Sequence, residues 1–349
     1  MQYRQLGRSG LRVSTLTMGT MTFGGRGGFA KVGSTDLAAA RRQIDMCVAA
    51  GVNFVDTANM YSAGLAEEIV GQAVAGKRDS LLLSTKVRLA MGEGQNDAGL
   101  SRHHIIREAE ASLRRLRTDY IDVYHTHGWD GQTPLEETME ALDSLVRSGK
   151  VRYLGASNYA GWQLMKALAV ADKHGYQRFV SNQIYYSLES RDVEYELVPA
   201  SLDQGLGIMV WSPLAGGLLS GKYRRGTETT EGRSVGVWDD PPVRDKEKLY
   251  DTIDALVRIA EDRGAKPAQI ALAYLLAKPG VTTLVVGARR DEQLRDNLAA
   301  AEIELTTAEF DELDRISRPW LIYPMWHQIK SAADRFGATE HAAFGGYLY

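Results

Sequence analysis

The segment that decides the fold is IDVYHTHGWDGQTPLEETMEALDSLVRSGKVRYLGA, residues 121–156. A short apolar run at 121–125 is followed by an amphipathic stretch at 135–148, which ends before Gly149, and by a second short run at 152–156. This order predicts a strand, a helix and a second strand parallel to the first, because parallel strands need a long crossover connection that a helix can supply. The middle of the chain therefore contains one complete βαβ unit.

The same alternation extends in both directions from this segment, and it repeats eight times. The predicted strands lie at residues 16–19, 54–56, 81–85, 121–125, 152–156, 179–182, 208–211 and 283–286. Helical periodicity and end signals predict helices at 36–50, 66–75, 101–116, 135–148, 161–174, 193–204, 246–263, 268–278, 291–301 and 308–316. Eight βα units in one chain predict an α/β fold of the (β/α)8 TIM barrel type, with extra helices and a C-terminal tail.

A doubly wound sheet would alternate in the same way, but it usually has a G-x-G-x-x-G turn after its first strand. The chain has no such motif, and the glycines past the first predicted strand do not fit its spacing: Gly24, Gly25, Gly27 and Gly28. We therefore favour the closed barrel, as a single domain over residues 1–349. Residues 224–244 and 318–349 are expected to be irregular, and the latter segment is expected to form a tail near a substrate pocket.

Composition excludes several classes of protein. The chain has 349 residues and a formal net charge of -3, which does not favour a nucleic-acid partner. The single cysteine, Cys47, cannot form an internal disulfide or a zinc site with two or more cysteines, and no metal is expected. The sequence has no signal-peptide core and no apolar run of about 20 residues, so we expect a cytoplasmic protein without a membrane partner. The oligomeric state is not predicted.

Polar side chains with complementary chemistry follow three neighbouring strands. Asp56 ends the second strand with Tyr61 close behind it, Lys86 ends the third, and His125 and His127 lie at the end of the fourth. Active sites of these barrels form at the C-terminal ends of the strands, so the side chains can converge. A phenol is a poor proton donor at neutral pH, but a nearby ammonium stabilises its phenolate and lowers its pKa. A carboxylate can hold that ammonium, and a neutral imidazole can orient a carbonyl.

Each of these residues also has a simpler interpretation when it is taken alone. An aspartate after a strand often caps a turn, a lysine is usually solvated, and Tyr61 could serve only in packing. His125 and His127 alternate along one strand, so only one of them is expected at a given level of the barrel. The functional interpretation depends on finding all four groups together at adjacent strand ends.

Three of these segments resemble the aldo-keto reductases: DTANMY (56–61), STK (84–86) and DVYHTH (122–127). The opening segments LGRSGLRVS (6–14) and LTMGTMTFG (16–24) resemble the start of the same family, and the match runs from about residue 3 to about residue 317. The resemblance implies a catalytic tetrad of Asp56, Tyr61, Lys86 and His127. It selects His127 over His125 because the family histidine lies five residues after the aspartate of the fourth strand.

The second half of the chain resembles the cofactor side of the family. The amide and hydroxyl groups after strands five and six suit a carboxamide, and an indole after strand seven suits a flat nicotinamide ring. The resemblance implies cofactor contacts at Gly19, Thr20, Met21, Asp56, Ser157, Asn158, Gln183, Trp211, Ser212, Pro213, Leu214, Gly216, Leu218, Lys222, Gly287, Arg289, Gln293 and Asn297. Arg289 can bind a 2′-phosphate, which favours NADP(H). The spacing of Gly287, Arg289, Gln293 and Asn297 resembles that found in the family branch that includes the potassium-channel β subunits and related bacterial reductases.

The implied activity is reversible hydride transfer between NADP(H) and a small-molecule aldehyde, ketone or alcohol, with Tyr61 as general acid. We expect the substrate pocket to be lined by Phe23, Met60, Tyr61, His127 and Trp129, which suggests an apolar or aromatic ligand. Two alternatives remain. One is an NADPH-binding regulatory subunit with little turnover, and the other is a barrel isomerase or lyase without nicotinamide.

Overall fold

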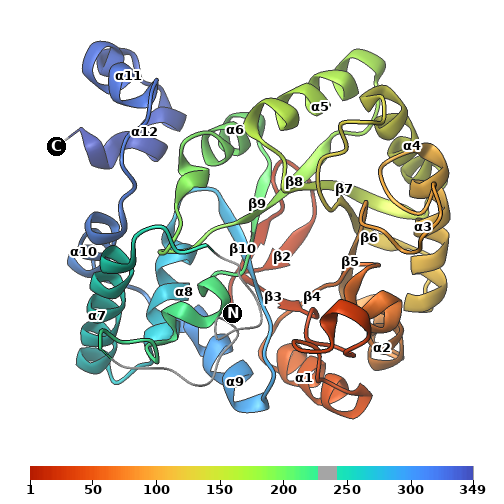
Figure 1. Cartoon of the computed structure of the whole chain (residues 1–349), viewed down its shortest axis with the longest axis horizontal. Coiled ribbons are helices and arrows are strands. Elements are labelled where there is room, and N and C mark those ends of the chain that lie inside the picture. Colours follow the sequence, from red (N-terminus) through yellow and green to blue (C-terminus); the bar gives the residue numbers. More distant parts are fainter. Residues whose placement is uncertain (227–241, 349) are drawn as a thin grey trace.

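Eight parallel strands form a closed barrel surrounded by helices, so the chain has the expected (β/α)8 architecture (Figure 1). The computed structural model describes residues 1–226 and 242–348. The barrel strands are β3 (Leu16–Gly19), β4 (Phe54–Asp56), β5 (Leu82–Val87), β6 (Ile121–Thr126), β7 (Val151–Ser157), β8 (Phe179–Tyr185), β9 (Gly207–Trp211) and β10 (Val281–Val286). They follow one another in chain order, and β10 closes the barrel by pairing with β3.

The helices that follow the strands cover the outside of the barrel. They are α1 (Leu37–Ala49), α2 (Leu65–Ala73), α3 (Arg102–Leu116), α4 (Leu135–Arg147), α5 (Gly161–His174), α6 (Leu197–Gln204), α7 (Lys246–Arg263), α8 (Pro267–Ala277), α9 (Asp291–Ala299) and α10 (Thr307–Ser317). Local end signals explain several boundaries. Asp36 caps α1 and Ser101 caps α3 through their side chains, while Gly264 ends α7 with a φ of 63° that a residue with a Cβ rarely adopts.

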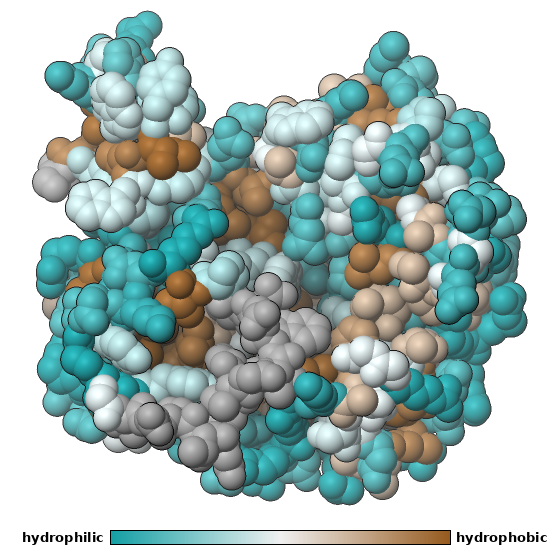
Figure 2. All heavy atoms as spheres, in the orientation of Figure 1, coloured by the Kyte–Doolittle hydropathy of each residue, from teal (hydrophilic) through white to brown (hydrophobic). Residues whose placement is uncertain are grey.

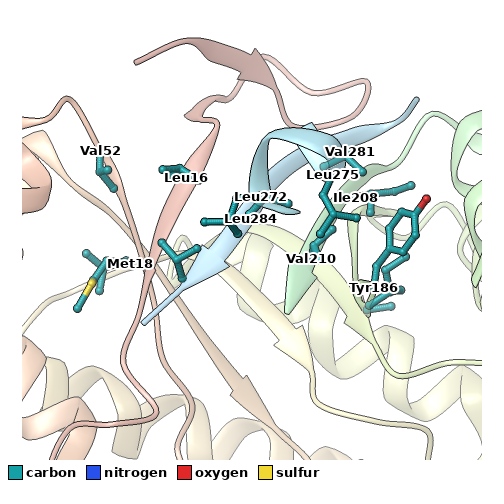
Figure 3. Close-up of a cluster of buried hydrophobic side chains, with 14 of the residues drawn as sticks. Leu16, Met18, Val52, Tyr186, Ile208, Val210, Leu272, Leu275, Val281 and Leu284 are labelled. Carbon is teal, nitrogen blue, oxygen red and sulfur yellow. The ribbon is translucent and has the colours of Figure 1, made fainter. Parts of the chain in front are cut away.

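The interior of the barrel is layered from apolar to polar. At one end, Phe54, Val123 and Met209 pack against the N-terminal residues Leu6 and Val13. Polar side chains at the ends of the strands lie above this layer, as described below. Because successive residues of a strand face opposite sides, the alternate residues point outward and pack against the helices. Figure 3 shows part of this outer core, where Leu16, Ile208 and Leu284 of the strands lie near Leu272 and Leu275 of α8.

Three features differ from the sequence prediction. An antiparallel hairpin, β1 (Tyr3–Gln5) with β2 (Arg12–Ser14), was not predicted. The helix expected at 193–204 is divided into a 3-10 turn at Asp192–Glu194 and α6, because Glu196 between them has non-helical angles of −135° and −44°. The tail also contains two short helices, α11 (Met325–Ala332) and α12 (Ala338–Phe344).

The C-terminal helices stand at one side of the barrel, where α12 packs against α6 (Figure 1). In Figure 2, apolar atoms lie in a hollow between this segment and the barrel. Most of the expected irregular segment 224–244, residues 227–241, lies outside the described residues. Among the described helices, none has both the length and the apolar character that crossing a bilayer requires.

Candidate active site

Asp56 and Lys86 form an ion pair inside the mouth of the barrel. Asp56 is the last residue of β4 and Lys86 lies one residue before the end of β5. The Lys86 Nζ donates to Asp56 Oδ2 at 2.6 Å and to the Thr57 carbonyl at 2.7 Å, and its side chain has no solvent exposure. Asp56 Oδ1 accepts from Ser84 Oγ at 2.6 Å and from Gln183 Nε2 at 3.0 Å. These hydrogen bonds therefore fix the positions of both charged side chains.

Electrostatics keep both members of this pair ionised. Burial alone would raise the pKa of the Asp56 carboxyl, but the charge of Lys86 and the hydrogen bonds from Lys86 and Ser84 hold that pKa below its ordinary value. Burial alone would lower the pKa of the Lys86 ammonium. Asp56 and Tyr61, through charge and hydrogen bonds, raise that pKa instead. Lys86 is thus a fixed cation at neutral pH.

Tyr61 lies beside this cation. The Lys86 Nζ is 5.2 Å from the centre of the Tyr61 ring, and a hydrogen bond between the two side chains is among the interactions that raise the pKa of Lys86. The loop after β4 turns sharply at this point, since Ser62 and Ala63 have φ values of 50° and 52°. Phe29, which the sequence prediction did not include, packs its ring 5.6 Å from that of Tyr61.

His127 and His125 occupy different levels of the barrel. The His127 ring lies at the rim, 5.8 Å from the Tyr61 ring. The His125 ring is completely buried deeper in the barrel, where its Nε2 is 3.1 Å from Ser181 Oγ. The structure thus brings His127, rather than His125, next to Tyr61. A Cβ at Gly155 of β7 would come within 2.2 Å of His125, so only glycine leaves room for this ring.

Both imidazoles are neutral at physiological pH. Burial, followed by the charge of Lys86, lowers the pKa of His127 to about 3. Burial also lowers the pKa of His125 to about 3, against the opposing charge of Asp56. A neutral imidazole can donate a hydrogen bond to a carbonyl without adding a charge to the site.

The predicted nicotinamide contacts form a connected group on the other side of the mouth. Trp211 Nε1 donates to Asn158 Oδ1 at 3.1 Å, and Asn158 Nδ2 donates to the His127 carbonyl at 2.9 Å. The Ser157 hydroxyl is buried and has no hydrogen-bond partner within the described part of the chain. An unsatisfied hydroxyl beside two amides, Asn158 and Gln183, fits a carboxamide that can both donate and accept hydrogen bonds.

The segment after β9 has the backbone of a tight loop. Ser212, Ala215, Gly216 and Gly217 all have positive φ values, and Ser212 Oγ accepts from the Gly216 N–H at 3.0 Å. Such turns can direct backbone N–H groups towards a phosphate. Within this loop Pro213 is buried and Leu214 is partly exposed; beyond it, Leu218 is buried and Lys222 is exposed.

The remaining predicted cofactor residues lie around β3 and β10. Gly19 ends β3, and the Thr20 hydroxyl that follows donates to the Asp56 carbonyl, while Met21 is partly exposed. Gly287 follows β10, and Arg289 is exposed, with Nη2 donating to the Lys31 carbonyl at 3.3 Å. On α9, Gln293 is exposed and Asn297 is buried. These positions are compatible with an extended ligand across the mouth.

The predicted substrate residues do not all reach the surface. Met60 and Trp129 are partly exposed near the rim, whereas Phe23 is completely buried and packs in the core. A cavity of about 600 Å³ lies between the ends of β7 and β8 and the tail, and its lining includes none of the four predicted catalytic residues. Its lining includes Asn158 and Tyr185 on the barrel side and Trp320 and Ile322 of the tail. The Tyr185 ring, which sequence reasoning missed, lies 4.9 Å from Trp211.

This arrangement, a tyrosine beside a lysine–aspartate pair and a histidine at the mouth of a (β/α)8 barrel, is compatible with an oxidoreductase that acts on carbonyl groups. The chain matches the aldo/keto reductase family over residues 15–318, and it therefore belongs to that family. Members of the family generally bind a nicotinamide cofactor and have oxidoreductase activity.

The chain is similar to several individual proteins over most of its length. The chain is 42% identical to the uncharacterized oxidoreductase YrpG of Bacillus subtilis, over 87% of this chain and 92% of that protein. It is 35% identical to a probable voltage-gated potassium channel subunit beta of Arabidopsis thaliana, over 90% and 96% of the two chains. It is also 33% identical to the versiconal hemiacetal acetate reductase of Aspergillus parasiticus, over 93% and 99%.

Proposed function

We propose that this protein is an NADP(H)-dependent reductase that converts an aldehyde or ketone to an alcohol, or catalyses the reverse reaction. The observation that carries the proposal is the contact between Tyr61 and a buried Lys86 that Asp56 keeps charged. In addition, the free Ser157 hydroxyl near Asn158 and Gln183 suits the carboxamide of nicotinamide. The exposed Arg289 suits a 2′-phosphate and supports NADP(H) rather than NAD(H).

The four side chains have separate tasks in this proposal. NADPH, when bound, supplies the hydride to the carbonyl carbon. Tyr61 donates its hydroxyl proton to the carbonyl oxygen, and the Lys86 ammonium stabilises the phenolate that remains. Asp56 holds Lys86 in place. The neutral His127 donates a hydrogen bond to the same oxygen and orients the carbonyl. In the reverse direction, Tyr61 accepts the proton from the alcohol.

Replacing Tyr61 with phenylalanine tests this assignment. Tyr61→Phe removes the proton donor but keeps the ring, so we expect kcat for a reactive aldehyde to fall by about 10²–10⁴-fold. NADPH affinity, measured by fluorescence titration, should change little, and NADH is assayed alongside. Tyr124→Phe is the matched control, because the Tyr124 hydroxyl donates only to the Ile105 carbonyl, at 3.4 Å on the outer side of the barrel. Equal turnover in the wild type and Tyr61→Phe would refute the role of Tyr61.

The likeness to potassium-channel β subunits supports a second candidate, an NADPH-binding regulatory subunit with little turnover. The two functions differ in one measurement. A reductase oxidises many equivalents of NADPH per chain when a carbonyl compound is in excess, whereas a regulatory subunit would oxidise about one equivalent and then stop.

A further inference from the structure

Arg88 lies at the rim of the barrel mouth, and among the described residues the two terminal nitrogens of its guanidinium have no hydrogen-bond partner. It directly follows β5, two residues after Lys86, and it is partly buried. Its Nε donates to the Trp129 carbonyl at 3.2 Å, which fixes the side chain over the segment after β6. Within the described residues, its two terminal nitrogens have no hydrogen-bond partner and no carboxylate lies within 4 Å of them.

Among the described residues, the other partly or fully buried arginines use their terminal nitrogens: Arg4 donates to the Val281 and Leu276 carbonyls, and most of the rest pair with a carboxylate. Arg78 pairs with Asp122 at 2.8 Å, Arg115 with Glu67 at 2.5 Å and Arg191 with Glu194 at 2.8 Å. The Arg88 terminal nitrogens are not among the buried polar atoms without a partner, so they remain open to solvent and a ligand oxyanion can replace water at them. Arg88 thus differs from these arginines because both of its terminal nitrogens can donate hydrogen bonds to a ligand.

The backbone holds Arg88 in an unusual conformation. Its φ is 142°, a region that residues with a Cβ rarely adopt, and its carbonyl accepts from the Gly99 N–H at 2.8 Å. The adjacent Val87 carbonyl accepts from the His127 N–H, also at 2.8 Å. Gly128 contributes no side chain here, and a Cβ at that position would lie 4.0 Å from Arg88 Cδ. The Arg88 side chain therefore runs beside Gly128 and Trp129, the two residues that directly follow His127.

The barrel order separates this cation from the predicted cofactor phosphates. In the closed sequence of strands, β5 is four positions from β9, which is the largest separation that eight strands allow. The loop whose backbone N–H groups suit a cofactor phosphate follows β9. An anion that binds to Arg88 would therefore belong to the substrate and not to the cofactor.

From this juxtaposition we propose that Arg88 binds an oxyanion, a carboxylate or a phosphate, on the carbonyl substrate. The inference rests on the proposed function and narrows it to acidic aldehydes or ketones. The two terminal nitrogens of a guanidinium match the two oxygens of a carboxylate or phosphate in a bidentate hydrogen bond. Lys86 cannot take this role because Asp56 and Thr57 already bind its ammonium.

Three aldehydes of similar shape test the proposal: 4-formylbenzoate, 4-formylphenyl phosphate and the neutral 4-formylbenzamide. The measured quantity is kcat/KM for each anion divided by that for the amide, so a general loss of activity cancels. We expect the wild type to prefer one or both anions. Arg88→Gln should lower the preferred ratio by about tenfold to a hundredfold, the range for loss of a charge-assisted hydrogen bond. If only one of the two ratios falls in Arg88→Gln, that anion, carboxylate or phosphate, is the group that Arg88 binds.

Two further variants separate local binding from a change in overall charge. Arg88→Lys keeps the cation and should retain part of the preference for the anionic aldehydes, although an ammonium lacks the two parallel N–H groups that bind both oxygens. Arg102→Gln removes a cation from α3 that pairs with Glu140 at 2.8 Å, and it should leave the ratios as in the wild type. An unchanged ratio in Arg88→Gln, or an equal fall in Arg102→Gln, would overturn the assignment.

A binding measurement separates this inference from the proposed function. Calorimetry compares 4-(hydroxymethyl)benzoate with 4-(hydroxymethyl)benzamide in the wild type and in Arg88→Gln, and it needs no turnover. If none of the aldehydes is reduced but the carboxylate binds through Arg88, the reductase proposal fails and the oxyanion site stands. If the neutral aldehyde is reduced and neither anion depends on Arg88, only the oxyanion site fails.

Discussion

His125 of β6 and His127 of the following loop lie at different depths of the barrel, but burial has the same effect on both imidazoles. Both point towards the barrel interior, where burial favours the neutral imidazole and lowers each pKa to about 3. In the unfolded chain, an imidazole has an ordinary pKa near 6.5. Between these values, the unfolded state binds protons that the folded state does not.

The free energy of unfolding should therefore decrease as the pH falls from about 6.5 towards 3. The slope is at most about 1.4 kcal/mol per pH unit for each imidazole. Urea unfolding at several pH values between 4.5 and 7 measures it, and His125→Asn should flatten the curve because one of the two groups is removed. Over the same range, the neutral His127 should contribute no inflection to kcat. An imidazole inflection near pH 6.5 that disappears in His127→Asn would contradict the assigned protonation state.

At the scale of elements, a buried ionic cluster joins the segment after β8 to two outer helices. The Arg191 guanidinium donates to Glu194 and, at 2.8 Å, to Asp314 of α10. Lys278, which follows α8, lies 3.1 Å from Glu194 and 3.2 Å from Asp314, and the Tyr274 hydroxyl of α8 donates to Asp314. These contacts position the segment after β8, which carries one wall of the cavity between the barrel and the tail.

Replacing Arg191 with methionine should destabilise the protein by about 3–5 kcal/mol, because Glu194 and Asp314 would lose one of their two shared cations and Lys278 alone would remain between the two buried carboxylates. Arg258→Met is the matched control, since Arg258 of α7 pairs at the surface with Asp262 of the same helix and with Glu312 of α10. That variant should lose less than about 1 kcal/mol. Urea denaturation measures both values, and equal losses in the two variants would show that the buried cluster contributes no more than a surface pair.

At the scale of the whole molecule, the barrel closes before the tail begins. The pairing of β10 with β3 completes the sheet, and residues from Pro319 onward add α11 and α12 outside it. The tail contacts the body through α12 on α6 and through the Tyr195 hydroxyl, which donates to the Trp320 carbonyl. Trp320 and Ile322 also line the cavity between the tail and the ends of β7 and β8.

Ending the chain at Arg318 should therefore leave a folded barrel. Far-UV circular dichroism should retain the signal of a mixed helix and strand protein, and NADPH affinity should stay within about threefold. The KM of carbonyl substrates that reach the cavity should change, because one of its walls is removed. The truncated chain is compared with the full chain by thermal melting and by kinetics with a small and a bulky aldehyde. Loss of the cooperative melting transition would show that the tail is part of the barrel's folding unit.

The sequence was sufficient to predict the barrel because each strand and helix has its own periodicity. The bounds of β3, β4, α5 and α7 agree with the prediction residue by residue. The β1–β2 hairpin was missed because its strands have three residues each and carry little pattern of their own. It gains its burial from the barrel, through the packing of Leu6 and Val13. The two short tail helices, likewise, lack a repeating unit that would reveal them.

The sequence by itself determined the eight βα units and placed Asp56, Lys86 and His127 at strand ends, which parallel strands must bring to one mouth. Only the tertiary structure decided which side chains touch there. Gln183 hydrogen-bonds to Asp56 across 127 positions of the chain, and Arg88 reaches the Trp129 carbonyl. The tertiary structure also buries Phe23 completely, although the sequence had predicted it to line the substrate pocket. Periodicity specifies the face of an element on which a residue lies, whereas the distance between residues on different elements depends on how those elements pack.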